Sequence, residues 1–378
     1  MIYDVIVVGG GPAGATVAYH LARGGLKVLL LERQKIPRDK LCGGLLSLKA
    51  AKLLNFDLSE VIEKEIFKAN ISFGKLKRVI GGFGAVGYLL SRDKFDQFLC
   101  AKAKSEGADI LDGARVTEIE QKSEDVIVRC EGKTLRSKIV VGADGIGSIV
   151  AKAMNLSEGE MGLALLTKIP YKKNKLLKKA FKSVLMDYGC IPGGYGWVFP
   201  KQDHLNVGIG TSNKKKYTQL KRYFYKFLSN QGFLPKGEDI EISAHPVPLG
   251  NKMEKFQNGR TLVVGDAAFL AEPFFGEGIY WSVYSAQMAA SVIVKKLKEK
   301  TSGEFSLHEY EESIQKLVLP EINAARAVAK TFYRSPRKLF ISMNKKVEKS
   351  ISQLVTGDLT FQEYVNSDIL KRWIFRPR

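Results

Sequence analysis

The chain has 378 residues, of which 45% are hydrophobic, and a formal net charge of +20. This length exceeds what one hydrophobic core usually holds, so we expect two lobes and a tail. The charge suits nucleic acid or anionic lipid, but no zinc spacing, RNA-binding aromatic motif or DNA-binding helix pair accompanies it, so no nucleic-acid partner is expected. C-x-x-C spacing is absent, which argues against a metal centre, an iron–sulfur centre and a disulfide scaffold. The four cysteines are Cys42, Cys100, Cys130 and Cys190.

No signal peptide is predicted, because the chain starts directly on a strand pattern. No apolar run reaches the ~18 residues that a bilayer span requires. We therefore expect a cytoplasmic protein, either free or peripheral to the membrane.

The first stretch that carries chemistry is Asp4–Gly14. Val5–Val8 is a short β-branched apolar run, typical of a buried parallel strand. The glycines that follow, Gly9, Gly11 and Gly14, have the spacing G-x-G-x-x-G. Such glycines allow a tight turn, the close approach of a pyrophosphate to the backbone, and close packing of the next helix.

A helix over about Ala13–Arg23 and a second strand over Lys27–Leu31 follow. The helix N-terminus offers free N–H groups and a positive dipole end to phosphates. Glu32, at the end of the second strand, suits a bidentate hold on a ribose diol. Strand, glycines, helix, strand and acid in this order predict a dinucleotide site rather than a bare turn.

The next segment, Leu41–Leu45, places Gly43 and Gly44 beside Cys42, which suggests backbone packed close to a flat group. Ser47 stands where disulfide reductases carry their second cysteine, so a dithiol centre is not expected. A small buried filler is the alternative role for Cys42.

The glycine-rich stretch Val79–Leu90 predicts a hairpin of a second sheet, turning at Gly81-Gly82. A helix capped by Ser91 follows, and Arg92 at its start either reaches a phosphate or is an ordinary surface arginine. Short strands are predicted at 110–111, 114–119 and 126–130.

Two further strands end in an acid. Ile139–Val150 contains Asp144, which can cap a helix and meet a cofactor indirectly. Thr261–Ala268 contains Asp266, which can bind a cofactor hydroxyl or cap toward phosphates. A long helix predicted over Ile279–Lys298 would point its N-terminus at a ring.

Between these motifs, Met161–Gly210 alternates like an antiparallel sheet. Tyr195, Trp197 and Phe199 share one strand face, where core packing and an apolar pocket wall above a cofactor both remain open. A basic amphipathic helix is predicted over Lys214–Asn230.

Two basic clusters are either solvated surface or a contact with anionic headgroups. One cluster comprises Arg326, Lys330, Arg334, Arg337, Lys338, Lys345, Lys346 and Lys349. The other comprises Lys168, Lys172, Lys173, Lys175, Lys178, Lys179 and Lys182.

Three motifs together resemble those with which the flavoprotein hydroxylase superfamily binds FAD: Gly9–Gly14 with Glu32, Gly142–Gly145 and Gly265–Ala268. Other segments are similar to the geranylgeranyl reductase family: Cys42-Gly43-Gly44, Tyr195–Pro200, Gly276–Tyr280, and the tail Gly357–Thr360 with Tyr364. One departure is Leu45, where the family often has a third glycine.

The resemblance implies an α/β fold with an FAD-binding Rossmann-like (hydroxylase-type) domain, an antiparallel-sheet substrate domain and a helical C-terminal tail. It implies a reductase that saturates carbon–carbon double bonds of isoprenoid lipid chains, supplied with electrons by NAD(P)H or a ferredoxin-type donor. Cys42 would lie at the reacting face, with proton donation and packing both open. Tyr195, Trp197 and Phe199 would line a lipid tunnel.

The implied cofactor-binding set is Gly9, Gly11, Pro12, Ala13, Gly14, Glu32, Arg33, Cys42, Gly43, Gly44, Arg92, Val116, Asp144, Gly145, Gly265, Asp266, Gly276, Gly278 and Ile279. No metal site is expected. The expected FAD-binding parts are 1–75, 91–160 and 256–300. A substrate-domain hairpin at 76–90, a sheet domain at 161–255 and a helical basic region at 301–378 complete the chain.

Two other functions remain open. A flavin-dependent monooxygenase or halogenase is one, because Tyr195–Pro200 approaches the halogenase pattern Trp-x-Trp-x-Ile-Pro. A non-enzymatic flavin-binding protein at the membrane is the other. An electron-transfer flavoprotein:quinone oxidoreductase would need clustered cysteines, which this sequence lacks.

Overall fold

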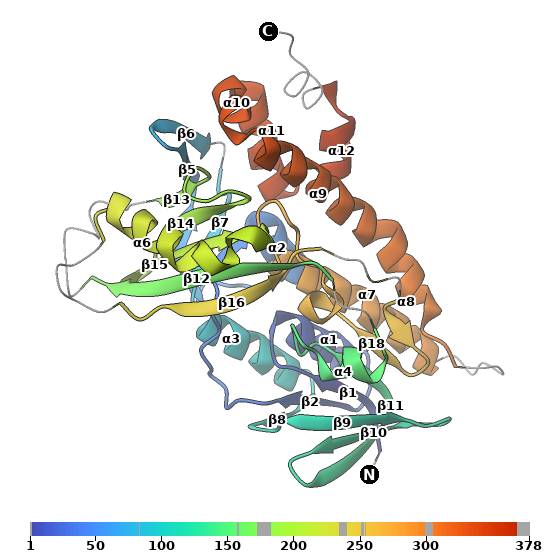
Figure 1. The fold of residues 1–378 in the computed structure, drawn as a ribbon. Helices are drawn as coiled ribbons and strands as arrows, with labels where there is room; N and C mark the ends of the chain where they lie inside the picture. The colour runs from blue at the N-terminus through green and yellow to red at the C-terminus, as the bar shows by residue number, and fades with distance from the viewer. Residues whose placement is uncertain are drawn as a thin grey trace. The chain divides into compact units, whose positions relative to one another are not determined.

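The computed structural model describes residues 2–82, 84–156, 159–171, 183–233, 240–250, 253, 255–298 and 305–368. The chain divides into two compact units, each assembled from three separate stretches (Figure 1). Unit 1 consists of Met1–Lys40, Arg92–Glu160 and Pro248–Asn323. Unit 2 consists of Leu41–Ser91, Met161–Val247 and Ala324–Arg378.

Unit 1 is built on an eight-stranded sheet whose main path is β17-β18-β11-β1-β2-β8. From β18 to β8 each neighbouring pair is parallel, and β10 and β9 extend from β11 as an antiparallel pair. Val5–Val8 is at most 5% exposed, as expected for a strand covered on both faces. The strands are β1 (Ile2–Val8), β2 (Val28–Glu32), β8 (Asp109–Asp112), β9 (Val116–Gln121), β10 (Val126–Cys130), β11 (Lys133–Gly142), β17 (Gln257–Asn258) and β18 (Thr261–Val263).

The helices of unit 1 pack beside this sheet, with α1 against both α3 and α7. The helix predicted over 279–298 is confirmed at those bounds. The helical elements are α1 (Pro12–Arg23), α3 (Arg92–Ser105), α4 (Ile149–Ala153), η2 (Gly265–Ala268), α7 (Ile279–Lys298), α8 (His308–Ser313) and η3 (Ile314–Val318); α9 (Leu319–Arg334) begins here and continues into unit 2.

Unit 2 contains a seven-stranded sheet of order β16-β12-β15-β14-β13-β5-β6 and a three-stranded sheet of order β3-β7-β4. The predicted antiparallel pairing is confirmed for β12, β13, β14 and β15. The strands are β3 (Leu45–Ser47), β4 (Ile62–Ile66), β5 (Lys68–Phe73), β6 (Leu76–Gly81), β7 (Gly87–Leu90), β12 (Met161–Pro170), β13 (Val184–Asp187), β14 (Gly194–Pro200), β15 (His204–Thr211) and β16 (Ser243–Pro248).

Helix α6 covers the seven-stranded sheet, and its Phe224 and Phe227 join Val198 and Val207 in one apolar core. The helix predicted over 214–230 is divided into a 3-10 turn and α6. The helical elements of unit 2 are α2 (Leu48–Leu54), η1 (Lys214–Gln219), α6 (Leu220–Asn230), α10 (Pro336–Ser342), α11 (Lys345–Thr356) and α12 (Phe361–Asn366).

The hairpin predicted over 79–90 is wrong. Strand β6 pairs with β5 in the larger sheet, whereas β7 pairs with β3 and β4 in the smaller one. Gly81 and Gly82 both have φ of +100°, and a Cβ on Gly81 would lie 2.3 Å from the carbonyl oxygen of Phe67. These glycines therefore make a crossing between two sheets, which has the same local sequence signal as a hairpin turn.

The division into units differs most from the predicted boundaries at residues 41–75 and 301–378. Residues 41–75, expected with the FAD-binding domain, lie in unit 2, because β3 pairs with β7 and β5 pairs with β6 and β13. The region expected as a tail at 301–378 is shared between the units, and α11 packs on α2 and β6 of unit 2.

Lys172, Lys173, Lys175, Lys178, Lys179 and Lys182 of the second basic cluster lie outside the described residues. Within the described ranges, no helix is both long enough and apolar enough to span a membrane.

Candidate active site

The three acid-bearing motifs of unit 1 meet at the carboxyl ends of adjacent parallel strands. The backbone N–H of Ala143, after β11, donates to the carbonyl of Val8 on β1 at 2.8 Å. The N–H of Val264, after β18, donates to the carbonyl of Gly142 at 2.9 Å. In open parallel sheets ligands bind at this edge, so segments far apart in the sequence form one site.

The three glycines of the first motif differ in whether the surrounding protein leaves room for a Cβ atom. Gly9 has φ of +107°, and a Cβ there would lie 2.3 Å from the carbonyl oxygen of Ala143. A Cβ on Gly14 would lie 1.8 Å from the carbonyl oxygen of Gly9. Gly11, with φ of −83°, would meet only Nη2 of Arg38, at 3.7 Å. Packing requires glycine at the first two positions but not at Gly11, where the bare backbone leaves room for a pyrophosphate.

The turn leads into α1, whose first turn suits an anion. Pro12 occupies the start of the helix, and its N-cap residue Gly11 supplies no side-chain acceptor for the first N–H groups. Gly265 of the third motif lies against this turn, since a Cβ there would be 3.1 Å from Cβ of Ala13. The third motif thus adjoins the N-terminal end of α1.

Glu32 at the end of β2 is 4% exposed and accepts two backbone hydrogen bonds. The N–H of Gly10 donates to Oε2 at 2.8 Å, and the N–H of Gln34 donates to Oε1 at 3.0 Å. These bonds fix the carboxylate beside the glycine turn. Because a carboxylate has about four acceptor positions, it can also accept from a ligand hydroxyl.

A chain of alternating charges continues from Glu32. Nε of Arg38 lies 3.1 Å from Glu32, and Nη1 of Arg38 lies 3.1 Å from Asp96. Arg92 donates to both oxygens of Asp96, at 2.8 and 2.9 Å. All four side chains are at most 10% exposed, so each charge compensates the next in a poorly solvated place. Neither Arg38 nor Asp96 was predicted from the sequence.

Three other residues predicted to bind the cofactor, Arg92, Arg33 and Val116, lie in three different environments. Arg92, expected to reach a phosphate or solvent, is oriented by Asp96. Arg33 is exposed, and Val116 is buried at the start of β9, opposite Cys130.

Cys100 also contacts the glycine turn. Its thiol donates to the carbonyl of Gly10. Burial raises the pKa of this thiol to about 12, so Cys100 remains protonated.

Asp144 accepts hydrogen bonds from the start of α4, whose N-cap residue is Ser148. Its Oδ1 accepts from the hydroxyl of Ser148 at 2.5 Å, and its Oδ2 accepts from the N–H of Ile149 at 2.7 Å. Burial raises the pKa of Asp144, and these hydrogen bonds partly offset the rise. The adjacent Gly145 has φ of +74°, which lets the chain turn between the acid and α4.

Asp266 lies in the first turn of η2, beside the start of α7. Burial raises the pKa of Asp266, against the attraction of Lys40 and Arg92. A Cβ on Gly278 would lie 3.2 Å from Oδ1 of Asp266, so the backbone that leads into Ile279 passes next to the acid. Gly276 has φ of +71° in the same loop. In this arrangement Oδ1 of Asp266 can accept a hydrogen bond from a ligand hydroxyl.

In unit 2, Cys42, Gly43 and Gly44 form a segment that we call the Cys42–Gly44 loop. A Cβ on Gly43 would lie 2.8 Å from Cε2 of Phe199 and 3.5 Å from Nε1 of Trp197. The N–H of Gly44 donates to Sγ of Cys42 at 3.3 Å. The loop therefore packs directly on the aromatic strand β14.

The aromatic side chains of β14 form a row on one face, as predicted. Ring centroids lie 6.1 Å apart for Tyr195 and Trp197, and 6.3 Å apart for Trp197 and Phe199. Tyr188, which the sequence analysis did not single out, extends the row at 5.3 Å from Tyr195. Trp197 and Phe199 are 8% and 6% exposed, and Tyr195 is half-buried.

Comparison with known proteins identifies the class. Residues 86–318 match a family described as FAD binding domain, and residues 4–44 match one described as FAD dependent oxidoreductase. Since the glycine turn and the ligand edge of unit 1 fit a dinucleotide, the protein is an FAD-dependent oxidoreductase, and the predicted FAD-binding fold is confirmed.

The particular family follows from the relatives. The chain is 32% identical over 369 residues to the chloroplastic geranylgeranyl diphosphate reductase of Oryza sativa, covering 90% of this chain and 77% of the relative. It is 32% identical over 323 residues to the digeranylgeranylglycerophospholipid reductase of Methanococcus vannielii, covering 82% and 81%. The chain belongs to the geranylgeranyl reductase family.

A solved structure supports the same family. A geranylgeranyl bacteriochlorophyll reductase-like protein of Thermoplasma acidophilum has a TM-score of 0.77 and 26% identity, over 99% of this chain and 97% of that one. A flavin-dependent brominase, at 17% identity and a TM-score of 0.73 over 94% of each chain, shares the fold alone.

Proposed function

We propose that this protein uses reduced FAD to saturate carbon–carbon double bonds in the isoprenoid chain of a lipid. The names of the relatives support the reaction, because they are reductases of geranylgeranyl diphosphate and of digeranylgeranylglycerophospholipid. One observation in the structure carries the proposal furthest: the Cys42–Gly44 loop presents a thiol beside a row of aromatic side chains.

When bound, FAD supplies the hydride that one alkene carbon receives. The neighbouring carbon needs a proton, and Cys42 is the donor that we assign. Its Sγ accepts a hydrogen bond from the N–H of Gly44 at 3.3 Å, which orients the thiol. Cys42 is half-buried, so its thiol is not sealed within the core.

The aromatic row would receive the isoprenoid chain. Tyr195 is half-buried, whereas Trp197 and Phe199 are buried against the Cys42–Gly44 loop. Apolar rings exclude water and bind an alkene chain through the area that they bury. We therefore assign Tyr195 to direct contact with the lipid, and Trp197 and Phe199 to the wall behind the thiol.

The electron donor would be NAD(P)H or a ferredoxin-type protein. In the described part of the chain, one sheet has the parallel strand, glycine turn and helix of a dinucleotide site. That site is assigned to FAD, so a nicotinamide cofactor would dock transiently.

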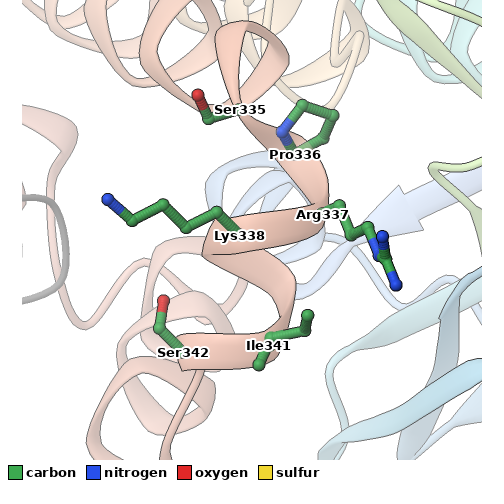
Figure 2. A pocket seen from close by; sticks show the side chains of 6 residues that line it. All are labelled: Ser335, Pro336, Arg337, Lys338, Ile341 and Ser342. Atoms are coloured by element: carbon green, nitrogen blue, oxygen red, sulfur yellow. The ribbon is translucent and has the colours of Figure 1, made fainter. Parts of the chain in front are cut away.

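We also propose that unit 2 contacts anionic membranes. Lys330, Arg334, Arg337, Lys338, Lys345, Lys346 and Lys349 are exposed. Figure 2 shows Arg337 and Lys338 extending in different directions from α10, around an open hollow that also involves Ile341. Ile341 is 54% exposed, so an apolar side chain accompanies the cations, as in interfacial anchors.

Mass spectrometry of lipids tests the reductase function. The protein would be expressed in a host that makes geranylgeranyl lipids, and each saturated bond would add two hydrogens to a lipid. A Cys42→Ser strain is the matched control. Oxygen or halogen added to a product would instead identify a monooxygenase or halogenase, and unchanged lipids with a fully reducible flavin would contradict the proposal.

A further inference from the structure

A buried lysine follows the aromatic strand. Lys201 comes directly after β14 and is 7% exposed. Its Nζ donates to the carbonyl oxygens of Gly44 and Leu90, each at 2.8 Å. The N–H of Leu90 donates to the same Gly44 carbonyl at 2.9 Å. One ammonium thus ties the end of the Cys42–Gly44 loop to the end of β7.

A second side chain holds the other end of the loop. Asn206 on β15 is 3% exposed, and its Nδ2 donates to the carbonyl of Cys42 at 3.0 Å. Its Oδ1 accepts from Nε1 of Trp197 at 2.8 Å, which fixes the amide orientation. Gly43 packs on Phe199 of β14, so each residue of the loop is held by β14, by β15 or by Lys201 directly after β14.

A short path of hydrogen bonds links Lys201 to the thiol, because Nζ of Lys201 donates to the carbonyl of Gly44, and the N–H of Gly44 donates to Sγ of Cys42. Burial lowers the pKa of Lys201 to about 8, while the carboxylate of Glu63 and the thiolate form of Cys42 oppose the decrease and Lys168 adds to it. The ammonium is therefore still the main form at pH 7. A cation near a cysteine favours its thiolate.

We propose that Lys201 is a positioning residue, whose ammonium anchors the Cys42–Gly44 loop and stabilises the thiolate that Cys42 leaves after giving up its proton. The proposal rests on the proposed reductase function. In the step, the S–H bond of Cys42 breaks and a C–H bond forms at the alkene carbon beside the one that receives the hydride. The electron pair stays on sulfur, and a proton from water restores the thiol.

A lysine that only satisfied two carbonyls would leave the acidity of Cys42 unaffected, so thiol acidity is the decisive measurement. In the FAD-loaded protein, alkylation of Cys42 by iodoacetamide would be followed from pH 6 to 11 by peptide mass spectrometry. Cys190 serves as an internal reference in the same unit, because burial raises its pKa well above the usual value. The variant is Lys201→Met, and the matched control is Lys226→Met on α6 of the same unit, where the side chain is exposed.

In Lys201→Met, the midpoint of the alkylation–pH curve should move upward by about one unit, which makes Cys42 about tenfold less reactive at pH 7. Lys226→Met should stay near wild type, and Lys201→Arg should restore most of the midpoint. A midpoint in Lys201→Met equal to that of wild type would overturn the proposal, whatever the lipid assay gives.

A second variant separates anchoring from charge and keeps the proposal falsifiable if Lys201→Met does not fold. Asn206→Leu removes the hydrogen bond to Cys42 but keeps the ammonium. The limiting alkylation rate at high pH should rise at least about threefold as the loop loosens, with the midpoint unchanged. An unchanged limiting rate would contradict the anchoring of the loop. Because neither measurement uses lipid, a failure of the reductase assay remains distinguishable.

Discussion

Nε of Arg38 lies 3.1 Å from Oε2 of Glu32, so the acid that ends β2 is already paired with a cation. The same guanidinium contacts Asp96 and lies near the backbone of Gly11. These contacts fix the position of the Glu32 carboxylate next to the glycine turn.

Replacing Glu32 by alanine should weaken FAD binding by ~1.5–3 kcal/mol, because a charged hydrogen-bond acceptor is lost. This corresponds to roughly 10- to 150-fold in Kd, measured by flavin fluorescence during titration. Asp109→Ala, which removes an exposed acid at the start of β8, is the control and should bind normally. Wild-type affinity in Glu32→Ala would show that this acid does not bind the cofactor.

The three glycines of the first motif should respond differently to alanine. Gly11→Ala should cost the apoprotein about 1 kcal/mol of unfolding free energy, since the added Cβ would meet only Arg38 at 3.7 Å. It should nevertheless weaken FAD binding at least about tenfold, because the methyl group occupies the place of the pyrophosphate. Gly9→Ala should instead destabilise the apoprotein by at least about 3 kcal/mol, because its φ is +107°. Thermal unfolding without FAD, and FAD titration, separate the two cases; equal FAD affinity in Gly11→Ala and wild type would exclude a pyrophosphate there.

The first nucleotide-binding motif of unit 1 was predictable because the residues that form it are close together in the sequence. Strand, glycine turn, helix and Glu32 occupy one continuous stretch, and each residue type has one strong conformational reason to be there. Arg38 and Asp96 were not predicted, because no local sequence pattern indicates that the segment after β2 contacts α3. The signal available was an acid, Asp96, between the apolar residues Phe95 and Phe98 of a helix.

The substrate half was less predictable because its key contacts join distant strands. Lys201 looks like an ordinary surface lysine after Pro200, and only the folded chain carries its Nζ to Gly44 and Leu90. The hairpin predicted at Gly81-Gly82 was wrong for a similar reason, because the sequence does not show which strands pair. Glycines with positive φ occur equally well in a hairpin turn and in a crossing between two sheets.

Cys42→Ser should retain FAD and accept electrons from dithionite normally, because the hydroxyl leaves unit 1 unchanged. Reduction of an isoprenoid lipid should fall by ~10²–10⁴-fold, since a hydroxyl is a far poorer acid than a thiol near neutral pH. Stopped-flow flavin reduction and lipid turnover measure the two steps separately. Cys190→Ser is the matched control; a loss of only a few-fold in Cys42→Ser would make Cys42 a packing residue.

Binding to anionic vesicles should decrease with salt if unit 2 contacts the membrane electrostatically. Arg337→Glu with Lys338→Glu should weaken flotation with anionic vesicles by at least about thirtyfold, because each basic residue near the surface contributes about 1 kcal/mol. Lys214→Glu with Lys215→Glu makes the same charge change elsewhere in unit 2. Equal binding to neutral and anionic vesicles, or equal losses in both double variants, would count against this surface.

Lys201 should make the stability of the protein depend on pH. Its folded pKa is about 8, below the roughly 10.4 of an unfolded lysine, so between these values the unfolded chain holds a proton that the folded chain has lost. Stability should therefore rise with pH across this window, because the cost of burying the ammonium is fully present below pH 8 and is relieved above it.

The neutral amine still has two N–H groups for the carbonyls of Gly44 and Leu90, so both hydrogen bonds can persist. The rise should reach at most roughly 3 kcal/mol at pH 10.4, from about 1.4 kcal/mol for each unit of pKa. Urea unfolding of wild type and Lys201→Met at pH 7, 8, 9 and 10 measures it, because titrations common to both proteins cancel in the difference. The advantage of wild type over the variant should grow as the pH increases, whereas parallel curves would mean that Lys201 keeps its proton throughout.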